Sequence, residues 1–134
     1  MWSSPFGRKN MKKKILLVDD EKSFTNLLKL SLEQTGQYEV RVENYAEDAL
    51  PTAQEFHPDI MLLDIIMPRL PGGNVAAAIE SSPELKGTPI VFLTAAVRPH
   101  QVEENEGIIC DHPCIAKPAT LEQIVEVIEQ NVRK

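Results

Sequence analysis

The chain has 134 residues, a length typical of one domain, and its 43% hydrophobic and 25% charged residues give the composition of a globular protein. Its net charge is −6, and residues 15–134 alone hold nine basic and 20 acidic groups, which disfavours direct binding to nucleic acid. No apolar run approaches the roughly 20 residues of a transmembrane helix, and two cysteines make no disulfide framework, so we expect a cytoplasmic protein without a membrane partner.

The chain divides into a short extension and one domain. Residues 1–10 show no periodicity, and we expect them to be a disordered extension or a remnant of cloning. The folded domain is expected over residues 11–134, because Lys12–Lys14 lead straight into the first apolar run.

Five strand patterns, four of them short apolar runs and one an apolar–polar alternation over Tyr38–Glu43, alternate with helical patterns along this domain. The predicted strands are Ile15–Val18, Tyr38–Glu43, Ile60–Leu63, Ile90–Leu93 and Cys114–Ala116. The predicted helices are Ser23–Thr35, Ala46–Phe56, a third that starts after Gly72-Gly73 and runs to about Ser81 or Ser82, Pro99–Glu106, and a fifth that follows Thr120. Five strand–helix units in succession predict an α/β fold, a doubly wound five-stranded parallel sheet with helices on both faces.

Local signals set the expected helix ends and buried faces. In the first helix, Phe24, Leu27, Leu28 and Ser31 recur at helical spacing, and Gly36 is expected to close it. Pro51 should kink or shorten the second helix. Thr120 and Gln123 form a capping-box pattern at the last helix. The buried stripe of that helix is expected to comprise Leu121, Ile124, Ile128 and Val132.

Polar residues end four of the predicted strands. Asp19-Asp20, Asp64, Thr94 and Lys117 follow the first, third, fourth and fifth strands, and the carboxyl ends of parallel strands share one edge of the sheet. Three carboxylates held close together repel each other unless a cation intervenes, and Mg²⁺ prefers oxygen ligands of this kind. A carboxylate beside such an ion can act as a nucleophile, with an ammonium and a hydroxyl stabilising the transferred group. The pattern therefore predicts phosphoryl chemistry on an aspartate.

Four motifs in order resemble the receiver domain of two-component response regulators, over about Lys13 to Lys134. They read Val18-Asp-Asp-Glu21, Leu62-Leu-Asp-Ile-Ile-Met-Pro68, Phe92-Leu-Thr-Ala95 and Lys117-Pro118. The resemblance implies a flavodoxin-like (βα)5 fold with strand order 2-1-3-4-5. It also implies a signalling switch whose partners are a sensor histidine kinase or phosphotransfer protein and a downstream protein.

The resemblance assigns a role to each motif residue. It implies that Asp64 is the phosphoacceptor and that Mg²⁺ is held by Asp20, Asp64 and the backbone carbonyl of Ile66, with Asp19 acting mainly through water. Thr94 and Lys117 would contact the phosphoryl group, small Ala95 would leave space for it, and the bond before Pro118 would be cis.

One departure and several alternatives stay open. Cys114 occupies the position where the family usually has an aromatic switch residue, so the usual swing of a ring is absent. The chain could act as a stand-alone switch, as a phosphorelay intermediate, as part of a longer regulator, or as a phosphorylation-independent interaction module. A Mg²⁺-dependent aspartyl-phosphate phosphohydrolase is the competing enzyme class, and no Asp-x-Asp motif or cap domain supports it. We expect no catalytic turnover apart from autodephosphorylation.

Overall fold

The computed structural model describes residues 12–67, 70–94, 108–109 and 112–132. They form one sheet with strand order β2-β1-β3-β4-β6-β5. The strands are β1 (Lys13–Val18), β2 (Tyr38–Glu43), β3 (Ile60–Asp64), β4 (Ile90–Thr94), β5 (Ile108–Ile109) and β6 (His112–Ala116). The helices are α1 (Lys22–Gln34), α2 (Ala49–Phe56), α3 (Gly72–Ser81) and α5 (Leu121–Asn131), and a 3₁₀ turn, η2 (Ala46–Asp48), precedes α2.

The five predicted strands are all present, parallel and in the expected order. In the labels used here, the expected order 2-1-3-4-5 is β2-β1-β3-β4-β6. The structure adds β5, a two-residue strand that pairs antiparallel with β6 and that the sequence did not predict. Two residues are too few to show the alternation by which strands are recognised.

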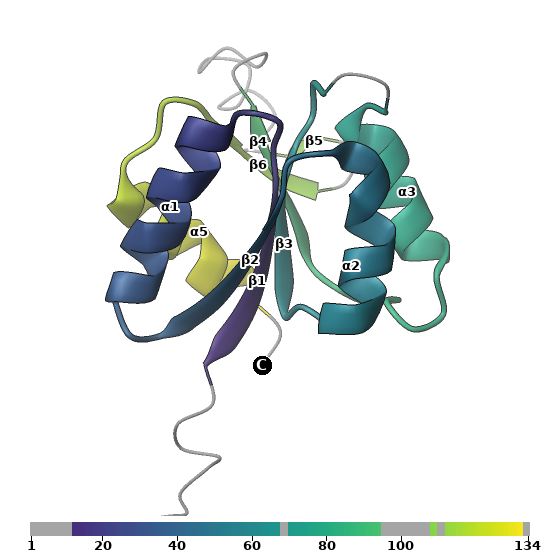
Figure 1. The fold of residues 1–134 in the computed structure, drawn as a ribbon, viewed down its shortest axis with the longest axis horizontal. Coiled ribbons are helices and arrows are strands. Elements are labelled where there is room, and N and C mark those ends of the chain that lie inside the picture. Colours follow the sequence, from purple (N-terminus) through teal and green to yellow (C-terminus); the bar gives the residue numbers. More distant parts are fainter. Residues whose placement is uncertain (1–11, 68–69, 95–107, 110–111, 133–134) are drawn as a thin grey trace, which may run out of the picture.

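Helices cover both faces of the sheet (Figure 1). Helices α1 and α5 lie on one face and α2 and α3 on the other. Successive side chains of a strand point to opposite faces, so β1 contributes to two separate cores. Leu16 and Val18 belong to the core on the α2 and α3 side, whereas Ile15 and Leu17 belong to the core on the α1 and α5 side. All four are fully buried, as a continuous apolar strand requires.

Helix α1 begins at Lys22 and ends at Gln34, one residue away from the predicted bounds at each end. Gly36 follows with a φ of 81°, the left-handed conformation that a glycine takes at a helix end with little cost. The buried residues of α1 are Thr25, Leu28 and Leu32, whereas Leu27 is 65% exposed. The apolar face of α1 predicted from the sequence spacing therefore packs against the core in part, and the rest of it is exposed to solvent.

The shortening expected at Pro51 is confirmed. The predicted helix from Ala46 divides into η2 and then α2, whose first residue is Ala49. Pro51 is consequently the third residue of the α-helix, where the backbone N–H has no partner within the helix and its loss costs little.

Helix α5 has the predicted capping box. The Thr120 hydroxyl accepts from the Gln123 N–H at 3.1 Å, and the Gln123 side chain accepts from the Thr120 N–H at 2.9 Å. Ile124, Ile128 and Val132 are buried as expected. The prediction for Leu121 is wrong, since this side chain is 37% exposed. It occupies the first position of the helix and lines the pocket between α1 and α5.

Two predictions lie outside the described residues: the disordered extension over residues 1–10 and the fourth helix over Pro99–Glu106. Among the residues that the structure does describe, no helix has both the length and the apolar character needed to cross a bilayer.

Candidate functional site

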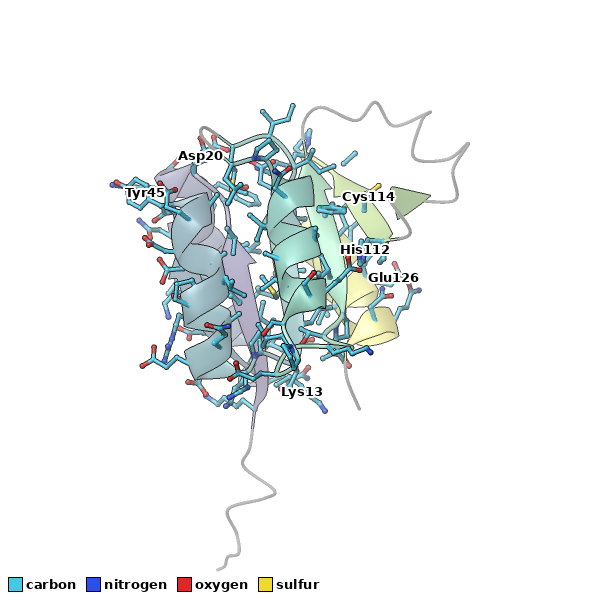
Figure 2. The ribbon with its side chains drawn as sticks, turned by 90° about the vertical axis from the view of Figure 1, so that its right-hand side faces the viewer. Lys13, Asp20, Tyr45, His112, Cys114 and Glu126 are labelled. Carbon is cyan, nitrogen blue, oxygen red and sulfur yellow. The ribbon has the colours of Figure 1, made fainter. Side chains whose placement is uncertain are left out.

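Three carboxylates meet at the carboxyl ends of β1 and β3. Asp19 and Asp20 directly follow β1, and Asp64 is the last residue of β3. One carboxylate oxygen from each residue lies within 4.8 Å of the others. Asp19 and Asp64 are buried and Asp20 is exposed, so the group opens to solvent on one side. Figure 2 shows Asp20 at the opposite end of the sheet from Lys13.

The Lys117 ammonium reaches this cluster from the loop after β6. Its Nζ lies 2.5 Å from Asp19 Oδ2, 4.0 Å from Asp64 Oδ2 and 3.8 Å from Glu21 Oε1. The Lys117 side chain is only 14% exposed. The bond between Lys117 and Pro118 is cis, as the resemblance implies. One cation thus faces three acidic groups, two of which are buried.

Asp64 holds its proton more tightly than an ordinary aspartate. Burial is the main cause of the rise of its pKa to about 6, and the neighbouring charges of Asp19 and Asp20 add to it. The Lys117 ammonium and the Ile66 N–H act in the opposite direction, the latter donating to Asp64 Oδ1 at 3.3 Å. The site therefore has more negative charge than Lys117 neutralises.

This excess of negative charge fits a hard divalent cation. Three carboxylates within reach of one point, one of them exposed, offer the oxygen ligands that Mg²⁺ takes while it keeps several waters. Both Asp19 oxygens already accept hydrogen bonds, from Lys117 and from the Glu21 N–H at 2.9 Å. The residues present therefore fit Mg²⁺, with Asp20 and Asp64 freer to approach it than Asp19.

Of the two predicted phosphate contacts, Thr94 and Ala95, the structure describes only the Thr94 backbone, at the end of β4. In the sheet register Asp64 pairs with Leu93, and the Thr94 backbone pairs with Ala116, so β4 brings residue 94 to the same sheet edge as the acids. The Thr94 side chain and all of Ala95 lie outside the described residues.

Cys114, the atypical switch residue, is buried in the core on the α2 and α3 side. Burial raises the pKa of its thiol. Two residues earlier in β6, the His112 ring packs edge-on against Phe92 at 5.6 Å, and its Nε2 lies 2.9 Å from Glu80 Oε2 on α3. A small side chain therefore fills the position from which an aromatic ring would swing.

Asn44, which was not predicted from the sequence, links the backbone at Asp19 to α1 by hydrogen bonds. Its side-chain N–H donates to the Asp19 carbonyl at 2.7 Å and to the Thr25 hydroxyl at 3.0 Å. Asn44 directly follows β2, so the strand-end rule that identified the acids could also have found this residue.

The third helix was predicted to start after Gly72-Gly73, but Gly72 is already the first residue of α3, and its role in the site was missed. A Cβ on Gly72 would lie 2.1 Å from the Asp64 carbonyl oxygen, far inside contact distance. The Gly72 N–H also donates to the Ile65 carbonyl at 2.7 Å. The absence of a side chain thus lets the loop after Asp64 fold back tightly.

The chain is similar to known proteins in sequence and in fold. The family model described as the response regulator receiver domain matches residues 15–129. The alkaline phosphatase synthesis transcriptional regulatory protein PhoP of Bacillus subtilis is 40% identical over 85 residues, which are 63% of this chain. That alignment covers 34% of PhoP, so the chain spans about a third of the length of this relative.

Solved structures of the same family share the fold. The chemotaxis protein CheY4 of Vibrio cholerae superposes with a TM-score of 0.77 at 27% identity, covering 90% of this chain and 98% of that one. The N-terminal domain of a response regulator receiver protein from Methanoculleus marisnigri gives a TM-score of 0.65 at 30% identity, covering 87% and 94%. The chain belongs to the response regulator receiver domain family.

Proposed function

We propose that this chain is a phosphorylation-driven switch that accepts a phosphoryl group on Asp64. The observation that carries the proposal is the position of the Asp64 carboxylate, with Asp19 and Asp20 beside it and the Lys117 ammonium 4.0 Å away. Receiver domains work with histidine kinases or phosphotransfer proteins, so the donor is a phosphohistidine.

The proposed step is a displacement at phosphorus. An Asp64 carboxylate oxygen attacks the phosphorus, the bond to the donor imidazole nitrogen breaks, and the imidazole leaves with a proton. Lys117 supplies positive charge next to the transferred group, and the Thr94 hydroxyl and Ala95 backbone complete the contacts that the family resemblance implies. Because the pKa of Asp64 is about 6, this carboxyl is mostly ionised at neutral pH and ready to attack.

Mg²⁺ is the proposed cofactor. When bound, it neutralises charge on the carboxylates and on the transferred phosphoryl group. Asp20, Asp64 and the Ile66 carbonyl are the proposed ligands. Asp19 acts mainly through water, which agrees with the two hydrogen bonds that already occupy its oxygens.

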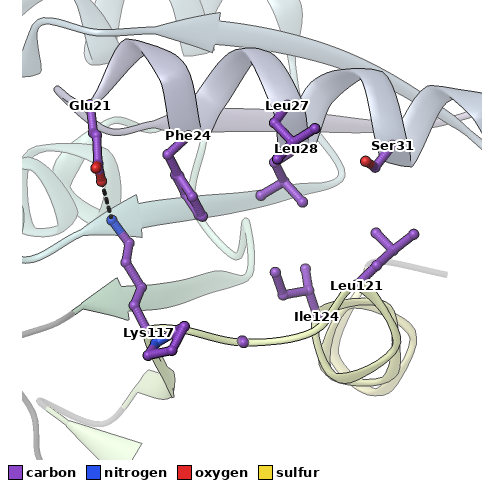
Figure 3. Close-up of a pocket in the computed structure, with 10 residues that line it drawn as sticks. Glu21, Phe24, Leu27, Leu28, Ser31, Lys117, Leu121 and Ile124 are labelled. Atoms are coloured by element: carbon purple, nitrogen blue, oxygen red, sulfur yellow. Dashed lines mark ion pairs between the residues drawn. The ribbon is translucent and has the colours of Figure 1, made fainter.

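A protein is the proposed phosphodonor, because exposed apolar side chains line a pocket that reaches Lys117 of the candidate site. Leu27 on α1 is 65% exposed and Leu121 on α5 is 37% exposed. Both line a pocket of about 470 Å³ between the two helices, and Lys117 lines the same pocket (Figure 3). Exposed apolar groups next to a reactive site favour a protein surface as the donor over a small polar molecule.

Phosphorylation is proposed to change partner binding, since it replaces a carboxylate by a group with a charge of about −2. We propose no turnover apart from autodephosphorylation, and a place of action in the cytoplasm. The presence of Cys114 in place of the family's usual aromatic switch residue favours a second candidate, an interaction module with this fold that works unphosphorylated.

Intact mass spectrometry tests the proposal. After incubation with acetyl phosphate and Mg²⁺, the wild type is expected to gain one phosphoryl group, and Asp64→Asn none. Asp48→Asn, which removes an exposed acid in η2, is the matched control and should still be phosphorylated. No gain from acetyl phosphate or from a phosphorylated phosphotransfer protein would overturn the proposal and favour the unphosphorylated module. Hydrolysis of p-nitrophenyl phosphate with turnover would instead support the phosphohydrolase.

A further inference from the structure

The Lys117 ammonium has one neighbour that is neither acidic nor part of the receiver motifs. Its Nζ lies 4.2 Å from the centre of the Phe24 ring, on the first turn of α1. Figure 3 shows the Phe24 side chain projecting from α1 toward the strand end where Lys117 extends to Glu21. The face of an aromatic ring carries partial negative charge and attracts a cation at this distance.

The acidic groups and the ring together confine a side chain that would otherwise be mobile. A lysine stem has several rotatable bonds, and holding it in one conformation costs entropy. Asp19 at 2.5 Å and Asp64 at 4.0 Å attract the ammonium from the carboxylate cluster. Phe24 reaches the same atom from α1, so that the ammonium is held between the helix and the acids.

We propose that Phe24 is a positioning residue for Lys117. Its ring holds the ammonium beside Asp64 before the phosphoryl group arrives, so that no reorganisation of Lys117 is needed during transfer. This inference rests on the proposed function and adds to it a residue that acts only through Lys117.

The simpler explanation is that Phe24 merely fills the pocket between α1 and α5, which Leu28 and Ile124 also line. Phe24→Leu separates the two explanations, because leucine keeps the apolar contact and removes the ring. Phe24→Tyr keeps the ring face and serves as the rescue variant. Phe56→Leu is the matched control, since Phe56 lies under Arg41 and Lys14 at the far end of β1 from the acids.

The test combines two measurements. The first is the rate of phosphorylation with Mg²⁺ present, and the second is a spectroscopic signature of Lys117 in the metal-free protein. Phe24→Leu is expected to slow phosphorylation by acetyl phosphate about three- to tenfold, whereas Phe24→Tyr and Phe56→Leu stay close to wild type. In nuclear magnetic resonance spectra, the Lys117 methylene protons next to Nζ should lie upfield in the wild type because of the ring. They should move downfield in Phe24→Leu and return in Phe24→Tyr.

The outcomes distinguish a failure of the positioning role of Phe24 from a failure of the proposed phosphorylation of Asp64. Wild type that is phosphorylated, with Phe24→Leu equally fast or with unchanged Lys117 signals, would overturn the positioning role alone. Wild type that never gains a phosphoryl group, from acetyl phosphate or from a phosphotransfer protein, would overturn the proposed function and the positioning role with it. A rate loss of the same size in Phe56→Leu would also count against Phe24, because it would show a general effect of lost packing.

Discussion

At Asp64, burial and two neighbouring acids act against ionisation, while Lys117 and one backbone N–H act for it. The balance raises the pKa of this carboxyl from 3.8 to about 6. An acid whose pKa is raised by folding destabilises the folded state at every pH above that pKa. The penalty disappears as the pH falls from 6 toward 3.8, because the folded state then takes up the proton.

We therefore expect Asp64→Asn to stabilise the metal-free protein at pH 8. A difference of about two pKa units corresponds to at most about 3 kcal/mol in the free energy of unfolding. Urea unfolding in EDTA at pH 8 and at pH 4 would measure this difference, which should be largest at pH 8 and close to zero at pH 4. Asp48→Asn is the control. A stabilisation of equal size at both values would show that ionisation of Asp64 is not its cause.

Gly72 makes a second prediction at the residue scale. In Gly72→Ala the new Cβ would overlap the Asp64 carbonyl, only 2.1 Å away, so the loop must shift. We expect a loss of about 2 kcal/mol or more in the free energy of unfolding and slower phosphorylation of Asp64.

Gly73→Ala is the matched control for this change. A Cβ on this next glycine would have no atom within 4 Å, and alanine favours a helix more than glycine does. Gly73→Ala should leave the phosphorylation rate unchanged and keep or slightly raise stability in urea. Equal behaviour of the two variants would contradict the tight packing described at Gly72.

At the scale of the elements, the strands were predictable because each buried strand is a run of apolar residues bounded by polar ones. The bounds of β2 agree with the prediction residue for residue. The buried face of α1 was harder to predict, because a threonine belongs to it. Thr25 is fully buried, and its hydroxyl bonds to the Lys22 carbonyl and to Asn44. Hydrophobicity alone does not reveal a buried polar group that bonds to its own helix and to a residue after another strand.

In the candidate site, too, some features follow from a sequence pattern and others depend on tertiary packing. Asp19, Asp20 and Asp64 could be brought together from sequence because parallel strands share one sheet edge. The contact of Phe24 with Lys117 could not, since it joins two residues 93 positions apart through side-chain packing that no local pattern encodes. The motifs thus identified the residues of the candidate site, and only the folded chain shows their neighbours.

The capping box gives a prediction for α5. Thr120→Ala removes the acceptor for the Gln123 N–H and should lower the free energy of unfolding by about 1 kcal/mol. Chemical denaturation would measure it beside Ser23→Ala, an exposed site in α1 where the change should be close to neutral. An unchanged midpoint in Thr120→Ala would mean that the cap contributes nothing to stability.

At the scale of the whole molecule, the charge cluster joins strands that are far apart in the chain. Asp19 and Asp20 follow β1, Asp64 ends β3 and Lys117 follows β6, so any ligand of the cluster binds only the folded state. Such a ligand raises stability by mass action.

We therefore expect MgCl2 to raise the melting temperature of the wild type by about 4 °C at ten times Kd. Asp20→Ala should abolish the shift, because it removes the exposed carboxylate that faces solvent. Differential scanning calorimetry at constant ionic strength, with NaCl replacing MgCl2 in the control, would measure it. Equal shifts in the wild type and in Asp20→Ala would point to a general effect of the salt.

The burial of Ile15 to Val18 on both faces of the sheet affects how the register of β1 is determined. Ile15 to Val18 are apolar on both sides, so sliding this strand by two positions would leave aliphatic side chains facing both cores. The free-energy cost of the shifted register arises at the two ends of β1. Sliding one way moves the already buried Asp19 away from Lys117 and in among aliphatic groups, and sliding the other way moves Lys14 into the core. An acid of the candidate site thus also disfavours misaligned versions of the sheet.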